Sequence, residues 1–216
     1  MIDTKYLRKT IGKLGALLPI IVLVLSLIYG YGFPDSISST YYIPSCITPF
    51  MIILGAASII LFCYKGYDKQ DDIICTFAGI FALGICLFPC ATKDLIARWP
   101  ELATLNKVGT FQITPSISGI AHNICAVGFF GLLSYNSLFL FTKSCGDMTA
   151  NKKKRNIIFR VCGISMIISL VAIVPISIFE IWGGVWLIET VALIFFGISW
   201  LTKANCYRLL FADKKS

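Results

Sequence analysis

The stretch VCGISMIISLVAIVPISIFEIWGGVWLIETVALIFFGISWL, residues 161–201, determines the class of fold. It holds two apolar runs, and only the short connection EIWGG at residues 180–184 separates them. Each run is long enough to cross a hydrocarbon core of about 30 Å as a helix, which takes roughly 17 to 25 residues. Because the connection is so short, we expect these two helices to be antiparallel neighbours in a membrane.

The rest of the chain has the same character. Hydrophobic residues make up 57% of the 216 residues and charged residues 14%, which is more apolar surface than one soluble core buries. The apolar stretches do not alternate with polar residues as membrane-spanning strands do. We therefore predict an all-α fold, a polytopic membrane bundle of six transmembrane helices in a single integral membrane domain, 1–216. The predicted spans are 14–32, 47–64, 73–91, 117–141, 157–181 and 185–201.

Basic residues predict the orientation. Of the 19 Lys and Arg residues, 16 fall on the side that holds the amino terminus. The other three are Lys93, Arg98 and Lys107. By the positive-inside rule, this bias places both termini in the cytoplasm. The net charge of +8 then reflects topology, and no nucleic-acid partner is predicted.

Membrane lipids are the predicted partners. A basic run beside a predicted span is typical of a segment that contacts anionic lipids of the inner leaflet. The run consists of Lys152, Lys153, Lys154 and Arg155. The oligomeric state is left open.

Two ionisable residues are predicted at membrane depth. His122, the only histidine, lies five residues inside the fourth span, and Glu189 lies four residues inside the sixth. Both spans enter from the outer side, so at 1.5 Å per residue both side chains are expected about 6 to 8 Å below the outer boundary. An ionisable group at this depth needs a partner or a wet cavity. One interpretation is a hydrogen bond that holds the bundle together, and the other is a polar pocket open to the outer leaflet.

The pocket interpretation defines the candidate residues. The predicted ligand-binding residues are His122, Glu189, Asp35, Ser36, Asn123 and Glu180. In an enzyme, Glu189 would orient His122, which would act as a general base on water or on a serine hydroxyl. The candidate serines are Ser38 and Ser39.

The nine cysteines form no Cys-x-x-Cys pair, and most are expected to be small core residues. Cys46 and Cys90 fall near outer helix ends, so a disulfide between them is left open. Zinc-dependent membrane hydrolases such as the alkaline ceramidases need several histidines, whereas this chain has one. Neither a metal nor a cofactor is predicted.

Three segments resemble signatures of the DRAM, Frag and Sfk clan of six-span membrane proteins, which includes bacterial relatives of unknown function. They are FPDSISSTYYIPS at 33–45, GIAHNICAVGFF at 119–130 and GVWLIETVALIFF at 184–196. The resemblance maps the clan's histidine to His122 and its acid to Glu189. The sequence departs from the clan's pattern at two places. In the clan a proline is followed by Ile-Ser, whereas here Asp35 and Ser36 separate Pro34 from Ile37 and Ser38; and Thr190 stands where the clan often has an aromatic residue. The resemblance implies a lipid-related role, and we expect an integral protein of the bacterial cytoplasmic membrane.

Three functions remain open at this stage. The first is binding of a lipid headgroup or a similar ligand in an outer-leaflet polar pocket. The second is a lipid-modifying enzyme, of the hydrolase or remodelling type, that uses the His-Glu pair. The third is a small-solute transporter or channel, for which polar residues through the full depth of the membrane are expected.

Overall fold

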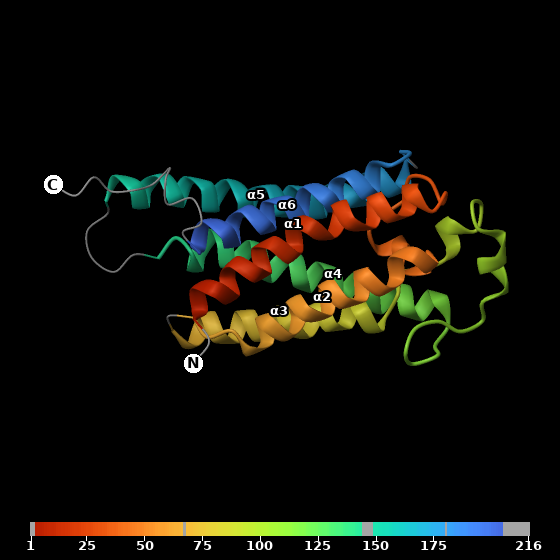
Figure 1. The fold of residues 1–216 in the computed structure, drawn as a ribbon, viewed down its shortest axis with the longest axis horizontal. Coiled ribbons are helices and arrows are strands. Elements are labelled where there is room, and N and C mark those ends of the chain that lie inside the picture. The colour runs from red at the N-terminus through yellow and green to blue at the C-terminus, as the bar shows by residue number, and fades with distance from the viewer. Residues whose placement is uncertain (1–2, 67, 144–148, 180, 205–216) are drawn as a thin grey trace.

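The computed structural model describes residues 3–66, 68–143, 149–179 and 181–204, and these contain six long helices and no β-strand (Figure 1). Each is long and apolar enough to cross a membrane. The helices are α1 (Thr4–Ile28), α2 (Pro44–Cys63), α3 (Lys69–Leu87), α4 (Pro115–Tyr135), α5 (Ala150–Ile178) and α6 (Gly184–Lys203). The predicted six-helix membrane bundle is confirmed, and the chain is a multi-pass membrane protein.

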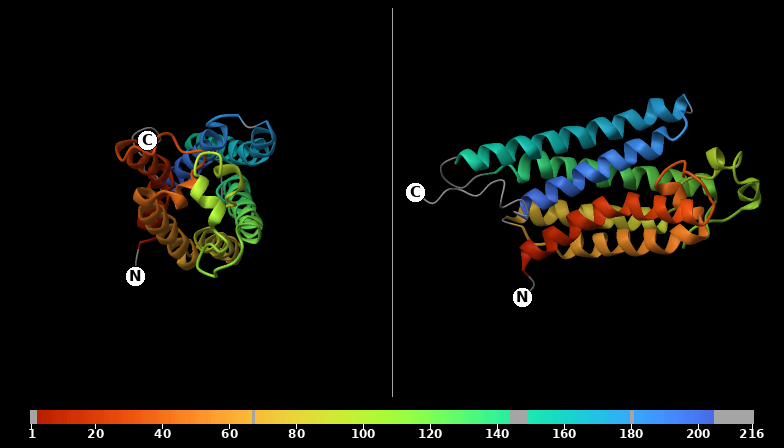
Figure 2. Two further views of the ribbon diagram at one scale, coloured as in Figure 1. Left: turned by 90° about the vertical axis from the view of Figure 1, so that its right-hand side faces the viewer. Right: turned by 45° about the horizontal axis from the view of Figure 1, so that its top comes forward.

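The helices surround the bundle axis in chain order (Figure 2). Each long helix packs against the next one in the sequence, and α6 closes the ring by packing against α1. The interior is filled by large apolar side chains that include Phe129, Leu133, Met166, Phe196 and Trp200. The start of α1 and the end of α6 lie at one end of the bundle, which the basic residues predict to be the cytoplasmic, inner end.

Short helices occur in the connections. Three 3₁₀ helices lie at the outer end: η1 (Ser38–Tyr42) between α1 and α2, and η2 (Lys93–Leu95) and η3 (Pro100–Thr104) between α3 and α4. A π-helical turn, η4 (Asn136–Leu140), continues α4 at the inner end. The connection between α3 and α4 is the longest one and projects beyond the bundle (Figure 1).

Two helices start well before the predicted spans. α1 begins at Thr4 rather than at residue 14, and α5 begins at Ala150 rather than at residue 157. Each starts after a side chain that accepts a backbone N–H of the first turn, Asp3 for α1 and Thr149 for α5. Hydropathy marks only the lipid-facing part of a helix, whereas such caps allow it to extend into the aqueous interface.

The two cysteines near the outer helix ends are not bonded to each other. Neither Cys46 nor Cys90 forms a disulfide bond. Cys46 is buried, and its Sγ donates to the backbone carbonyl of Val22 at 3.3 Å. Cys46 therefore helps to join α2 to α1 as a small core residue.

Gly79 permits a close approach of α2 and α3. The hydroxyl of Ser58 donates to the Gly79 carbonyl at 2.7 Å. A Cβ at position 79 would lie 2.7 Å from the backbone nitrogen of Phe62 and 2.7 Å from the carbonyl oxygen of Ser58. Because backbone atoms cannot swing aside, any side chain at this position forces the helices apart.

We therefore expect Gly79→Ala to lower the free energy of unfolding by about 1 to 3 kcal/mol through overpacking. The matched control is Gly55→Ala on α2, where a Cβ would meet nothing within 4 Å. This control is expected to change stability by less than about 0.5 kcal/mol or to raise it slightly, because alanine favours helix. Thermal unfolding of both variants in detergent measures the difference. Equal losses would contradict the close-packing interpretation.

Candidate functional site

The loop after α1 folds back on the outer end of that helix. Gly30 and Gly32 adopt φ of 78° and 76°, a backbone conformation that favours glycine, and they terminate α1. The hydroxyl of Ser26 donates to the Gly32 carbonyl at 2.6 Å, and the N–H of Tyr31 donates to the Ser26 carbonyl at 2.9 Å. These bonds direct the chain into η1, across the top of the bundle.

Glu189 anchors this loop to α6. Its Oε2 accepts the backbone N–H of Ile37 at 2.5 Å and that of Ser38 at 3.4 Å. Its Oε1 lies 3.2 Å from the hydroxyl oxygen of Ser38. One turn earlier on α6, the backbone N–H of Trp186 donates to the Asp35 carbonyl at 3.1 Å. The segment at the start of η1 is therefore hydrogen-bonded to two successive turns of α6, at Trp186 and at Glu189.

His122 approaches the same loop from α4. The residue is buried, at 4% exposed, and its Nε2 lies 3.1 Å from the Ser38 hydroxyl oxygen. Its Nδ1 lies 2.8 Å from the backbone carbonyl oxygen of Phe88. Ser38 thus lies between the imidazole of His122 and the carboxyl group of Glu189. The interpretation in which Glu189 orients His122 directly is wrong, because Ser38 intervenes and the Phe88 carbonyl orients the ring.

The Phe88 carbonyl is available because α3 ends just before it. Pro89 cannot continue the helix, so the carbonyls of residues 88–90 find partners outside α3. Besides the His122 contact, the hydroxyl of Ser118 donates to the Pro89 carbonyl at 2.7 Å. The hydroxyl of Tyr42 donates to the Cys90 carbonyl at 2.6 Å, and burial raises the pKa of Tyr42, so this donor stays protonated.

The hydrogen bonds of the cluster define its proton content. A carbonyl only accepts, so Nδ1 of His122 carries a proton. The hydroxyl of Ser38 can donate its single proton to only one of its two partners, Glu189 or His122. The other contact therefore requires a proton on that partner. Either a carboxylic acid at Glu189 donates to Ser38, which donates to Nε2, or an imidazolium donates to Ser38, which donates to a carboxylate. Both arrangements satisfy every contact and have no net charge, which explains how two ionisable groups are tolerated at this depth.

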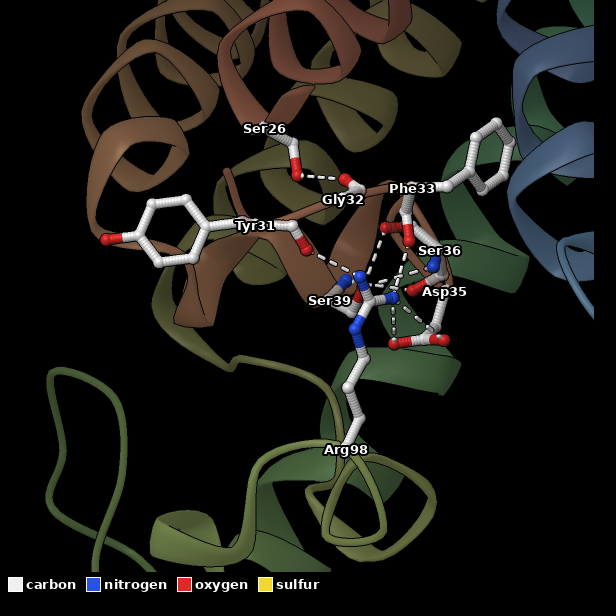
Figure 3. Close-up of polar contacts among 8 residues, drawn as sticks. All are labelled: Ser26, Tyr31, Gly32, Phe33, Asp35, Ser36, Ser39 and Arg98. Atoms are coloured by element: carbon white, nitrogen blue, oxygen red, sulfur yellow. Dashed lines mark hydrogen bonds and ion pairs between the residues drawn. The ribbon is translucent and has the colours of Figure 1, made fainter. Parts of the chain in front are cut away.

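Arg98, from the connection between α3 and α4, also holds this loop (Figure 3). It lies between η2 and η3, in a segment anchored to the protein by the buried side chains of Leu95 and Leu102. Its guanidinium donates to the backbone carbonyls of Tyr31 and Phe33, each at 2.5 Å. This role was not predicted from the sequence, although a basic residue on the side of the membrane depleted of positive charge is a usable signal.

Asp35 forms an ion pair with Arg98, and both residues line a pocket. The carboxylate of Asp35 lies 3.4 Å from the guanidinium, and the two side chains remain 38% and 31% exposed, respectively. They border an open pocket of about 340 Å³, whose other lining residues are Phe33, Ala97 and Trp182. The rings of Phe33 and Trp182 lie 5.4 Å apart, between centroids. The pocket therefore presents a cation, an anion and two aromatic rings.

The remaining predicted residues differ in position. Ser36 and Ser39 bind each other: each hydroxyl accepts the other residue's backbone N–H, and the Ser39 hydroxyl donates to the Ser36 carbonyl at 2.8 Å. Ser39 is therefore not a partner of His122. Asn123 lies on the exposed face of α4, and its ligand-binding role stays a prediction. Glu180 lies outside the described residues.

The described part of the chain contains no group of three or more His, Cys, Asp or Glu side chains that could hold a metal ion. No protein family model matches the chain, and no curated protein or solved structure matches it significantly. The resemblance to the DRAM, Frag and Sfk clan therefore stays a prediction.

Proposed function

We propose that the protein binds the polar headgroup of a membrane lipid in the outer pocket. The observation that carries this proposal is the pairing of Arg98 with Asp35 at the edge of an open pocket lined by aromatic rings. The pocket belongs to the end of the bundle where headgroups of the outer leaflet lie, and Trp182, which is 79% exposed, is of the type enriched at that level. A ligand that reaches the pocket from the lipid would present its headgroup first.

The two charges favour a zwitterionic phosphodiester headgroup. A guanidinium suits a phosphate, and a carboxylate beside aromatic faces suits an ammonium group. The contact between Arg98 and Asp35 is long, at 3.4 Å, and both side chains are partly exposed. Such an ion pair is weak by itself, so breaking it costs little free energy. The phosphate of a headgroup can then bind Arg98, and its ammonium group can bind Asp35.

Two buried polar atoms on α6 also support a ligand near this end. The indole N–H of Trp186 and the hydroxyl of Thr190 have no hydrogen-bond partner within the described residues. An unsatisfied buried donor is unfavourable by about 1 to 3 kcal/mol, so a bound polar group or a water is favoured beside it. Trp186 also contacts the pocket residue Phe33, with ring centroids 4.8 Å apart.

A lipid-modifying enzyme is the second candidate. It is favoured by the distance of 3.1 Å between Ser38 Oγ and His122 Nε2, which is within reach for a nucleophile and its general base. However, the backbone N–H groups of Ile37 and Ser38 are bound to Glu189 and are not available to stabilise an oxyanion. We therefore favour binding over hydrolysis.

The transport alternative has less support. The hydroxyls of Ser58 and Ser137, which are buried deeper in the bundle, each donate to a backbone carbonyl on a neighbouring helix. These contacts are typical of helix packing rather than of a solute path.

The binding proposal is tested with purified protein in nanodiscs that contain equal amounts of phosphatidylcholine and phosphatidylglycerol. After release into detergent, native mass spectrometry counts the lipids that remain bound. We expect phosphatidylcholine to be retained about tenfold over phosphatidylglycerol, equivalent to about 1.4 kcal/mol. Asp35→Asn should abolish this preference because it removes the charge that faces the ammonium group.

Glu101→Gln is the matched control, because Glu101 is an exposed acid in the same outer segment as Arg98. It should keep the preference of the unmodified protein, and thermal unfolding should show that both variants are folded. Equal retention of the two lipids by the unmodified protein, or an unchanged preference in Asp35→Asn, would refute the proposal. Appearance of lyso-lipid or free headgroup would support the enzyme instead.

A further inference from the structure

The outward side of α1 carries a row of lysines at the inner end of the bundle. Lys5, Lys9 and Lys13 are spaced four residues apart, and all three are exposed. Residues four apart lie on the same side of a helix, so the three side chains form one row along α1. We call this row the α1 basic face. Arg8, by contrast, is buried and lies on the packed side of the same helix.

The same side of α1 continues toward the membrane centre as an apolar stripe. Leu17, Ile20 and Val24 are exposed, and they follow Lys13 at helical spacing. On a membrane-spanning helix, exposed apolar side chains of this kind contact lipid chains. The α1 basic face therefore lies directly below acyl chains, on the side of α1 that faces the lipid.

Distances along the helix place the row at the level of the headgroups. At 1.5 Å per residue, Lys13 lies about 22 Å from Ile28 at the outer end of α1, and Lys5 lies about 35 Å from it. The hydrocarbon core is about 30 Å thick, so the row crosses its inner boundary. A lysine stem is long enough for the ammonium group of Lys13 to reach the headgroups while its methylenes stay in apolar surroundings. The three ammonium groups can therefore meet one layer of phosphates.

The lysines of the α1 basic face form no ion pair within the described residues. The acid nearest to them in the sequence is Asp3, whose side chain accepts the backbone N–H of Lys5 and so caps the helix. Lys143, at the same end of the bundle, is instead paired with Asp68 at 2.8 Å. An exposed row of positive charge at this level attracts the anionic headgroups of the inner leaflet.

We propose that the α1 basic face binds an anionic phospholipid of the inner leaflet, with its phosphate against the three lysines and an acyl chain along Leu17 and Ile20. An ammonium group on a flexible stem binds phosphate as a compact point charge, which suits a row of exposed lysines. Tyr6 is exposed beside Lys5, and tyrosine is enriched at this level of a membrane. A zwitterionic lipid also presents an ammonium group, which the lysines repel.

The sequence predicted contact between anionic lipids and the basic run 152–155. In the structure Lys153 and Lys154 are exposed, whereas Lys152 and Arg155 are partly buried. The Nζ of Lys152 donates to the Phe141 carbonyl at 3.0 Å. Contact of this run with lipid stays a prediction, and α1 offers a row whose three members all face outward.

The proposal is tested by photo-crosslinking in nanodiscs that contain equal amounts of phosphatidylglycerol and phosphatidylcholine. Photoreactive p-benzoylphenylalanine replaces Tyr6, and mass spectrometry counts the lipids that become attached to it. We expect at least fivefold more adducts of phosphatidylglycerol than of phosphatidylcholine. The same probe at Phe62, which is exposed near the inner end of α2, should show less than a twofold difference. Equal attachment of the two lipids at position 6, or equal enrichment at both positions, would overturn the proposal.

Charge-matched variants separate the α1 basic face from general attraction to a basic surface. Lys5→Gln, Lys9→Gln and Lys13→Gln, combined in the protein with the probe at position 6, should reduce the preference below twofold. The matched control changes three exposed lysines of the same end to glutamine, namely Lys65, Lys69 and Lys143, and should keep the preference. Equal losses in the two proteins would mean general attraction only and would overturn the proposal. Thermal unfolding checks that both proteins are folded, and the comparison of positions 6 and 62 does not depend on these variants.

The α1 basic face is open to the bilayer, so its lipids are expected to exchange when the protein is released into detergent. They are therefore measured in the intact bilayer, and they do not contribute to the lipids that the outer pocket retains. Neither outcome depends on the outer pocket.

Discussion

Glu189→Ala is expected to lower the free energy of unfolding by about 3 to 5 kcal/mol, because it removes the acceptor of two backbone donors and the partner of a hydroxyl. The donors are the N–H groups of Ile37 and Ser38, and the hydroxyl is that of Ser38. For a chain of this size the loss corresponds to a fall of roughly 10 °C in the unfolding temperature. Thermal unfolding in detergent measures it, and limited proteolysis should show earlier cleavage in the loop 29–43.

Glu101→Ala is the control for this variant, since Glu101 is exposed at the same end of the protein. It should change stability by less than about 0.5 kcal/mol. A Glu189→Ala protein as stable as this control would show that Glu189 does not anchor the loop.

Glu189→Gln tests where the shared proton lies. Burying a neutral pair costs less than burying two charges, so we expect a carboxylic acid at Glu189 and a neutral His122. The glutamine amide reproduces that arrangement: its oxygen accepts the two N–H groups, and its nitrogen donates to Ser38. The variant should therefore lose less than about 1 kcal/mol. A loss as large as that of Glu189→Ala would indicate the imidazolium and carboxylate arrangement instead.

His122→Ala is expected to cost about 2 to 4 kcal/mol, through a cavity in a packed region and a carbonyl left without its donor. The ring is 4% exposed and lies between the Phe88 carbonyl and the Ser38 hydroxyl. The control is Asn123→Ala, the adjacent residue on the exposed face of α4, which should stay within about 0.5 kcal/mol.

Combining His122→Ala with Glu189→Ala shows whether the two residues act through Ser38. Because both contact the same hydroxyl, the double variant should lose less stability than the sum of the single losses. Losses that add within about 0.5 kcal/mol would mean that the two residues act independently. The double-mutant cycle is measured from unfolding curves of the unmodified protein, the two single variants and the double variant, all recorded in one detergent.

The candidate site was partly predictable. Counting residues from the outer ends of two spans placed His122 and Glu189 at one depth, and the structure brings them into one cluster. The same count placed Asn123 beside them, yet each residue turns a helix by about 100°, which directs Asn123 to the exposed face. Ser38 was a candidate, but its place between the two ionisable groups depends on the path of a loop, for which hydropathy gives no signal.

The sequence by itself determined the number of spans, the end of the bundle at which each residue lies, and the depth of the ionisable side chains. These properties follow from the thickness of a bilayer, the rise of a helix and the distribution of basic residues. Only the tertiary structure decided which side chains meet around the axis: Ser38 with His122 and Glu189, Arg98 with Asp35, and Arg8 with Tyr64. Rotation of each helix and the course of each loop result from packing among several helices at once, and no single segment specifies that packing.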